Sequence, residues 1–185
     1  MSRRQSKVPR IRTARLDDAQ ALSRADFSFA IAKEARGPFV DSVGEIVPVT
    51  PYTKTYGFDE AEFARHARES DLFAMVADFD GRDEPIGYAL AAVDWNGFTV
   101  VDDIAVDKAY RGIGAARALM DAVRHWASER RLAGIRLETQ SNNLAACRFY
   151  ESCGFVLGGY DRHLYKALHP GTREVALFWY LMLAK

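Results

Sequence analysis

The chain has 185 residues, of which 49% are hydrophobic, and its 25 basic and 25 acidic side chains give a formal net charge of zero. This length suggests one domain, and the apolar content is enough for a core, which excludes disorder as a description of the whole chain. Because there is no basic excess, the composition also argues against a dedicated nucleic-acid binder.

Charge is distributed unevenly along the chain. Residues 1–15 hold six basic side chains and no acid, residues 16–107 hold seven basic and 19 acidic ones, and residues 108–185 hold twelve basic and six acidic ones. An acidic first half and a basic second half favour two ligands of opposite charge bound by one fold. Charge scattered over a solvated surface gives the same composition, so both interpretations stay open.

Apolar segments, cysteines and histidines indicate where the protein is located and whether it holds a disulfide or a metal. No stretch reaches the roughly 18 apolar residues of a membrane span, and the basic residues 1–10 lead into Ile11 without an apolar leader. We therefore expect a flexible arm on a cytoplasmic protein. Cys147 and Cys153 lie six residues apart in an expected helix, about 9 Å along its axis, which is too far for a disulfide. The four histidines show no metal-ligand spacing, so no metal is expected.

Hydrophobic periodicity and turn residues predict an α+β order of elements. In chain order we expect a strand at 11–14, a helix from Asp17 or Asp18 to about Ala35, an irregular connection at 37–57, a charged helix at 58–70, and strands at 72–77, 86–93 and 98–106. The connection is rich in Gly and Pro, and long loops of this kind are often functional. Tight turns join the last three strands, which predicts an antiparallel meander.

Helices and strands alternate in the second half of the chain. The apolar stripe of Leu119, Ala122, Val123 and Trp126 predicts a helix at 112–131. Beyond it we expect a strand at 135–139, a helix at 143–153 that ends at Gly154, and strands at 155–157 and 175–183. Together these elements predict a single domain at 11–185, with a mixed, largely antiparallel sheet of about seven strands and four flanking helices.

The stretch 104–119 carries the clearest functional signal. A strand there runs into a turn with Gly112 and Gly114 that opens a helix, so free backbone amides and the helix dipole meet whatever lies at the turn. This arrangement binds phosphate, and Arg111 adds positive charge. No P-loop is present, and Arg117 occupies the third small position of the dinucleotide fingerprint, so neither motif applies. A purely structural turn is the alternative.

The spacing Arg111-x-x-Gly114-x-Ala116 resembles the acetyl-CoA pyrophosphate signature of GNAT-type N-acetyltransferases. The strand at 104–106 is similar to the pantetheine-binding strand of that family, and the motif at 143–155 is similar to a second family feature. The resemblance implies the GNAT fold, acetyl-CoA as co-substrate, and direct transfer to a primary amine in a ternary complex. It assigns to the cofactor the residues Ile104, Ala105, Val106, Arg111, Gly112, Ile113, Gly114, Ala115, Ala116, Asn143 and Tyr150.

A narrower resemblance covers roughly residues 45–183. The block 134–161 and the aromatic run 178–180 are similar to streptothricin acetyltransferases, a group that acetylates an amine on the β-lysine portion of streptothricin and so confers antibiotic resistance. This chain departs from the group at Ile113, where relatives usually carry a phosphate-facing lysine, and at Asp102, where glutamate is frequent.

Amine acetylation needs a neutral acceptor, a polarised thioester carbonyl and a stabilised thiolate leaving group. The resemblance places Tyr150 beside the cofactor sulfur, so we expect it to be the general acid, since a phenol is well matched to a thiolate. Asp102 is the expected base, directly or through water, and Glu138 on the next strand competes for that role. Strand alternation predicts that Asp102 and Asp103 point to opposite faces of the sheet.

The resemblance and the charge pattern indicate a small cationic amine as the acceptor. No nucleic-acid or membrane partner is expected, and the apolar last strand leaves a homodimer open. We expect the acceptor to contact Trp95, Asp103, Glu138, Tyr52 and Tyr56. A covalent role for Cys147 is not favoured, because no histidine neighbours it in the motif. Two alternatives stay open: acetylation of a protein N-terminus or another small amine, and a non-catalytic acetyl-CoA-binding module.

Overall fold

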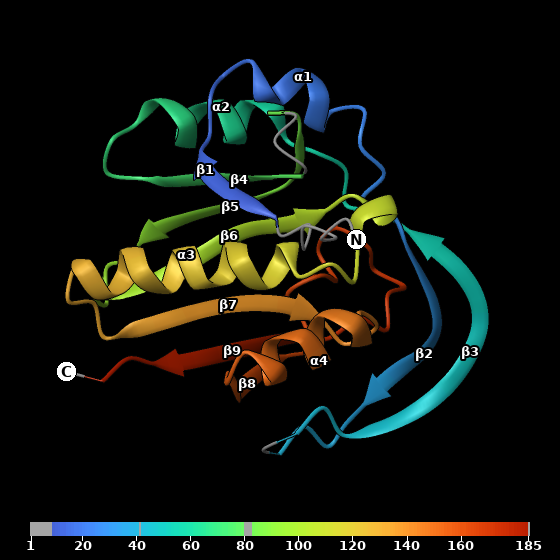
Figure 1. Ribbon diagram of the computed structural model, residues 1–185. Coiled ribbons are helices and arrows are strands. Elements are labelled where there is room, and N and C mark those ends of the chain that lie inside the picture. The colour runs from blue at the N-terminus through green and yellow to red at the C-terminus, as the bar shows by residue number, and fades with distance from the viewer. Residues whose placement is uncertain (1–8, 41, 80–82, 185) are drawn as a thin grey trace, which may run out of the picture.

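The computed structural model describes residues 9–40, 42–79 and 83–184 (Figure 1). The helices in these residues are α1 (Asp18–Leu22), α2 (Glu60–Arg68), α3 (Ala115–Glu129) and α4 (Leu144–Ser152), with a 3₁₀ turn, η1, at Lys108–Tyr110. The strands are β1 (Arg10–Thr13), β2 (Phe29–Arg36), β3 (Glu45–Lys54), β4 (Phe73–Asp78), β5 (Pro85–Val93), β6 (Phe98–Val106), β7 (Gly134–Gln140), β8 (Val156–Asp161) and β9 (Ala176–Met182).

Seven of the described strands form one mixed sheet in the order β1-β4-β5-β6-β7-β9-β8. β6 and β7 pair in parallel, and the other neighbours pair antiparallel. One core contains Leu119 of α3 and Tyr150 of α4, and a second core contains Leu22 of α1 and Phe63 of α2. The helix pairs α1–α2 and α3–α4 thus bury apolar side chains in different cores. The expected α+β sheet of about seven strands with four helices is confirmed.

α3 follows directly from its sequence pattern. Leu119, Val123 and Trp126 of the expected apolar stripe are buried, so one face of the helix packs on the sheet. The helix begins after Gly114, whose left-handed conformation makes it the N-cap. This start lies at the carboxyl end of β6, which is where the sequence places the phosphate-binding turn.

β2 and β3 form a separate antiparallel ribbon that was not expected from the sequence. The predicted helix to Ala35 is wrong beyond Leu22, and the predicted irregular connection contains β3. β2 is rich in helix-forming Ala, Lys and Glu, but pairing along β3 overrides this local propensity. β3 tolerates Pro48 and Pro51 because each strand of a two-stranded ribbon has an open edge, where a missing N–H breaks no ladder.

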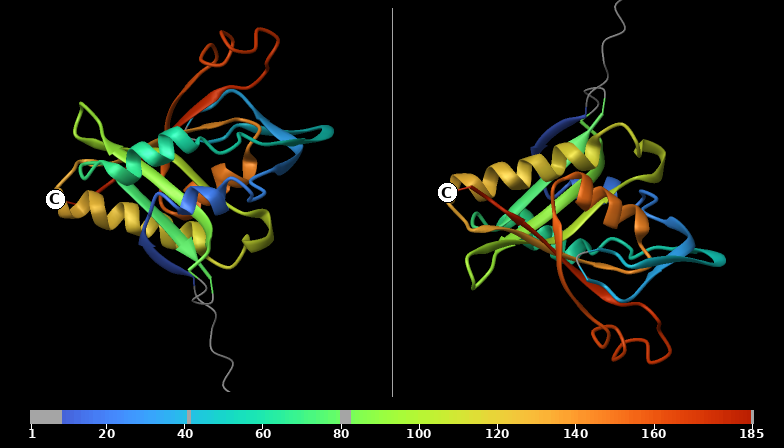
Figure 2. Two further views of the ribbon diagram at one scale, coloured as in Figure 1. Left: turned by 90° about the horizontal axis from the view of Figure 1, so that it is seen from above. Right: turned by 90° about the horizontal axis from the view of Figure 1, so that it is seen from below.

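The ribbon lies beside the connection between β8 and β9, residues 162–175, at one end of the molecule (Figure 2). Lys54 at the end of β3 forms an ion pair with Glu174 of that connection, with Nζ and Oε1 2.6 Å apart. The Asn142 amide donates to the same carboxylate at 3.0 Å. These contacts anchor the ribbon to the end of β7.

β6 contains a β-bulge next to the expected site. Its pairing with β5 shifts between Leu90–Asp103 and Ala91–Val101, so Asp102 is the extra residue. Bulges redirect side chains and interrupt the alternation of a strand.

The prediction that Asp102 and Asp103 point to opposite faces is therefore wrong. Asp102 contacts His66 of α2, and Asp103 accepts a hydrogen bond from Tyr88, which belongs to the core formed with α1 and α2. Both carboxylates reach the same side of the sheet. A bulge cannot be read from the sequence here, because no glycine marks it.

β6 and β7 separate after a short paired segment. Their pairing covers Phe98–Val100 and Gly134–Arg136, and the remainder of each strand lacks this partner. The sheet is thus open between the carboxyl-terminal halves of two parallel strands. The open edge of β6 carries the segment 104–106 that the resemblance assigns to the cofactor.

The predicted basic arm falls mostly outside the described residues, which begin at Pro9. Arg10 does not belong to such an arm, because it is the first residue of β1. Its Nε donates to Asp78 on the neighbouring strand at 2.9 Å. β1 therefore begins one residue before the strand expected at 11–14.

Candidate active site

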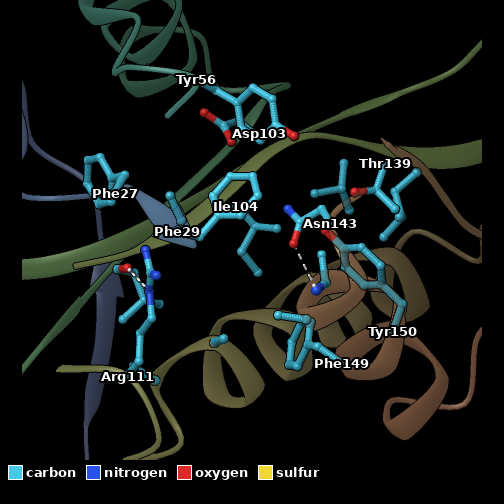
Figure 3. Close-up of a pocket in the computed structure, with 18 of the residues that line it drawn as sticks. Phe27, Phe29, Tyr56, Asp103, Ile104, Arg111, Thr139, Asn143, Phe149 and Tyr150 are labelled. Carbon is cyan, nitrogen blue, oxygen red and sulfur yellow. Dashed lines mark hydrogen bonds between the residues drawn. The ribbon is translucent and has the colours of Figure 1, made fainter. Parts of the chain in front are cut away.

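A cavity of about 740 Å³ opens where β6 and β7 separate (Figure 3). Its walls come mainly from residues 101–106 of β6, 137–140 of β7, the turn into α3 and one side of α4. The expected site residues that line it are Tyr56, Asp102, Asp103, Ile104, Ala105, Val106, Arg111, Gly112, Gly114, Ala115, Ala116, Glu138, Asn143 and Tyr150. The fold thus gathers residues that lie far apart in the chain into one site.

The turn between β6 and α3 forms one end of the cavity. Gly112 and Gly114 have φ angles of 81° and 94°, which glycine adopts without strain, and a Cβ at either position would meet nothing within 4 Å. The amides of Ala115 and Ala116 open α3 and have no partners within the helix. Open space in front of free amides at the positive end of a helix dipole fits a pyrophosphate.

Arg111 contributes positive charge at the same end. Its Nε donates to the carbonyl oxygen of Val106 at 3.1 Å, and its Nη1 donates to that of Ser28 at 2.7 Å. These bonds fix the guanidinium beside the turn. Arg117 of α3 also lines the cavity. Its Nη2 donates to the backbone oxygen of Ser152 at 3.0 Å. The Arg111 guanidinium, the free amides and the open edge of β6 together fit a ligand that joins a pyrophosphate to an amide-bearing arm.

Tyr150 approaches the cavity from α4 and is 7% exposed (Figure 3). The rings packed around it belong to Phe149, Phe155 and Trp179, with centroid distances of 5.4, 5.9 and 6.3 Å. Burial raises the pKa of Tyr150 above its ordinary value of 10.0. The phenol therefore holds its proton at neutral pH, as a general acid must before it acts.

Asn143 and Tyr56 lie beside Tyr150 and Asp103 in the cavity (Figure 3). The Asn143 Oδ1 accepts from the amide of Ala146 at 3.1 Å and caps α4. The Tyr56 hydroxyl donates to the side-chain oxygen of Gln140, which brings the end of the ribbon to the end of β7.

Carboxylates line the opposite end of the cavity. They belong to Asp59, Glu62, Asp102, Asp103 and Glu138. Figure 3 shows Asp103 on the far side of Ile104 from Arg111. The cavity is thus positive at the α3 end and negative at the α2 end. Four of its five acids come from the acidic first half of the chain and both of its arginines from the basic second half, which supports two ligands of opposite charge.

Tyrosine hydroxyls hold two of these carboxylates. The Tyr88 hydroxyl donates to Asp103 at 2.5 Å, and the Tyr165 hydroxyl donates to Oε1 of Glu138. Burial raises the pKa of both carboxyl groups, and the hydrogen bond from each phenol opposes that shift. Both acids are therefore stronger bases than ordinary carboxylates.

The raised pKa of Asp103 has a consequence for stability. Because the folded chain binds this proton more tightly, Asp103 contributes stability below its ordinary pKa of 3.8, and the contribution is lost as the pH rises through the raised value. Asp103→Asn should therefore raise Tm at about pH 7 by a few degrees, since about 1 kcal/mol moves Tm by about 2–4 °C in a chain of this size. The gain should vanish near pH 4. Thermal unfolding at both pH values checks this, and an equal gain at both would contradict it.

Three expected site residues lie outside the cavity. Trp95 is 93% exposed at the tip of the β5–β6 hairpin, at the paired end of β6 and away from the opening. The Tyr52 hydroxyl accepts from the Asn142 amide at 2.9 Å and braces the ribbon. Ile113 lies on the exposed outer side of the glycine turn. Trp95, Tyr52 and Ile113 are not among the residues that line the cavity, and their ligand contacts stay predictions.

Several site residues were not singled out from the sequence. Asp59 and Glu62 on α2 line the acidic end, and His66, Tyr88 and Tyr165 hold its carboxylates. The sequence predicts a charged helix here, but it does not predict which of its side chains face the cavity. Tyr165 lies in an irregular connection, where no periodicity indicates which side chains face inward.

Cys147 is buried and free, as is Cys153. Burial raises the pKa of the Cys147 thiol to about 12, so it is a poor nucleophile at neutral pH. In the part of the chain that the structure describes, no group of three or more His, Cys, Asp or Glu residues could hold a metal ion. No helix among the described residues is both long and apolar enough to cross a membrane.

The sheet opens between parallel strands, free amides at the start of α3 face the opening, and a buried phenol lies beside it. This arrangement fits a transferase that uses a coenzyme A thioester. A model of the acetyltransferase (GNAT) family matches residues 39–155, and the chain belongs to this family. It is an acetyl-CoA-dependent N-acetyltransferase.

Two curated relatives share a more specific description. The chain is 37% identical over 132 residues to a streptothricin acetyltransferase from Escherichia coli, with 71% of each chain covered. It is 35% identical over 130 residues to streptothricin acetyltransferase A from Bacillus subtilis (strain 168), covering 70% of this chain and 73% of the relative.

A crystal structure from Bacillus anthracis, in complex with acetyl coenzyme A, is similar over nearly its whole length. The TM-score is 0.82 at 32% identity, covering 95% of this chain and 99% of the other. This likeness agrees with the cofactor that fits the cradle and the open edge of β6.

Proposed function

We propose that this enzyme acetylates the β-lysine amine of streptothricin and so confers resistance to the antibiotic. The observation that carries the proposal is the set of five acidic residues that line the same cavity as the cradle, Asp59, Glu62, Asp102, Asp103 and Glu138. A β-lysine chain carries several ammonium groups, and a wall of carboxylates both attracts and orients them. The similarity to streptothricin acetyltransferases supports the same acceptor.

The cradle at one end of the cavity would hold the cofactor. Arg111, Arg117 and the amides at the start of α3 would hold the pyrophosphate, and the backbone of Ile104 and Val106 would bind the pantetheine arm. When bound, acetyl-CoA supplies a thioester whose carbonyl carbon forms the new C–N bond, while its C–S bond breaks and the sulfur keeps the electron pair.

The protons move between side chains of this chain and the reactants. Tyr150 gives its proton to the departing sulfur and regains one from solvent. The attacking nitrogen loses a proton to Asp102, directly or through water, and Glu138 is the competing acceptor. Asp102 lies two residues before Ile104 on the strand assigned to the cofactor, which favours it as the base.

An acceptor panel tests the function. The protein is mixed with acetyl-CoA and, in turn, streptothricin, a peptide with a free N-terminal amine and spermidine, and release of free thiol is followed. We expect kcat/KM for streptothricin to exceed that for the others by at least about 10²-fold. Only streptothricin would both pair its ammonium groups with the carboxylates of the cavity and place an amine at the thioester carbonyl. The rate with streptothricin should fall as ionic strength rises, because salt screens the attraction between these carboxylates and the ammonium groups of the acceptor.

The panel also separates the alternatives. Thiol release with the peptide but not with streptothricin would favour acetylation of a protein N-terminus. Tight binding of acetyl-CoA without release for any acceptor would favour a non-catalytic module. Either result would overturn the proposal.

A further inference from the structure

His66 of α2 does not line the cavity, but it contacts Asp102, one of the carboxylates that do. Its side chain is fully buried in α2, and its Nε2 lies 2.9 Å from Oδ2 of Asp102, whose side chain is 24% exposed. On the other side of the ring, Nδ1 lies 3.0 Å from the backbone carbonyl oxygen of Glu62. The imidazole thus bridges the helix backbone and the proposed base.

The two contacts determine where the protons lie. A carbonyl oxygen only accepts hydrogen bonds, so Nδ1 of His66 must carry a proton. If the ring were neutral, the lone pair of Nε2 would face the lone pairs of Oδ2 of Asp102. Two acceptors cannot form a hydrogen bond with each other, so a second proton lies between these two atoms. With this proton on Nε2, the ring donates to Oδ2 of Asp102, and the contact pairs an imidazolium with a carboxylate.

We propose that His66 is a positioning residue for acetyl transfer, present as an imidazolium that holds Asp102 ionised. One oxygen of Asp102 is fixed by the ring, and Oδ1 is left for the acceptor amine. The pair would have its origin in the bulge of β6, because the extra residue turns the Asp102 side chain toward α2. The inference rests on the proposed function for its kinetic part only.

The surroundings favour a positively charged ring. Glu62 lies one helical turn before His66 on α2, and Asp59 lies at the N-cap of the same helix. Asp102 and Asp103 reach the same side of the sheet from β6. A buried cation at this place is compensated by carboxylates on both elements that pack around it.

Nitrogen NMR of the full chain tests the charge of the ring independently of activity. Both ring nitrogens of His66 should resonate as protonated nitrogens at neutral pH, with a hydrogen-bonded proton on Nε2. Asp102→Asn should shift the Nε2 signal and leave Nδ1 nearly unchanged. An unprotonated Nε2 in the wild-type chain would overturn the assignment.

Kinetics test the positioning role. His66→Leu should lower kcat about 10-fold with KM for acetyl-CoA little changed, whereas His66→Gln, which keeps a donor toward Asp102, should recover most of the loss. In an Asp102→Asn background, His66→Leu should add almost no further loss, because its effect passes through that carboxylate. Losses that multiply independently would contradict the proposal.

The acceptor used is whichever amine the panel shows to be turned over, so the positioning role and the streptothricin assignment fail separately. If His66→Leu does not fold, the comparison of His66→Gln with the wild type and the NMR signature still decide whether His66 positions Asp102. A change in KM for acetyl-CoA without a change in kcat would place His66 in cofactor binding and overturn the inference.

Discussion

Tyr150→Phe should lower kcat by about 10²- to 10⁴-fold, the range typical of a lost general acid, while binding of acetyl-CoA stays close to that of the wild type. The variant removes one oxygen and keeps the ring, so the contacts with Phe149, Phe155 and Trp179 remain. Without the hydroxyl, the departing sulfur must leave as an unprotonated thiolate. Steady-state thiol release and calorimetric binding of acetyl-CoA measure the two quantities.

Tyr160→Phe is the matched control for this variant. Tyr160 is 42% exposed on β8 and lies outside the cavity, so removal of its hydroxyl should leave kcat unchanged. A Tyr150→Phe enzyme with nearly full kcat would show that solvent protonates the sulfur and that the phenol is only part of the core.

Asp102→Asn should lower kcat by about 10²-fold or more, whereas Glu138→Gln should lower it by less than about 10-fold and act mainly on KM for the acceptor. Asp102 lies on the strand assigned to the cofactor and is held by His66, while an oxygen of Glu138 is already engaged by Tyr165. The burial that raises the pKa of Glu138 makes it the rival base, so the two variants must be compared directly.

Asp71→Asn, an exposed change between α2 and β4, controls for the loss of one negative charge. It should change neither constant. The opposite ranking, with Glu138→Gln the more damaging variant in kcat, would transfer the role of base to Glu138 and leave Asp102 as a residue that attracts the acceptor.

The seven strands of the main sheet and its helices could be predicted because their local patterns agree with the packing. In α3, the stripe of Leu119, Val123 and Trp126 has the helical period and faces the sheet. The β2–β3 ribbon could not be predicted, because the Ala, Lys and Glu residues of β2 favour a helix locally. Only the pairing with β3 makes β2 extended. The prolines of β3 strengthened the wrong interpretation, since their tolerance depends on an open edge.

The cofactor end of the site could be predicted better than the acceptor end. Gly112, Gly114 and Arg111 form a contiguous motif whose geometry follows from the turn itself. The acidic end is assembled from α2, β6 and β7, and its geometry depends on a bulge at Asp102 that no local signal reveals. The position of Trp95 outside the cavity shows a related limit of local patterns: a hairpin tip can be read from Asn-Gly, but its distance from the opening of the sheet cannot.

The most direct test of the proposed function is the structure of the product. The protein is incubated with acetyl-CoA and streptothricin, and tandem mass spectrometry locates the added acetyl group. We predict one acetyl group on an amine of the β-lysine portion, formed together with one equivalent of free coenzyme A. Unmodified streptothricin, or an acetyl group on any other part of the antibiotic, would contradict the account.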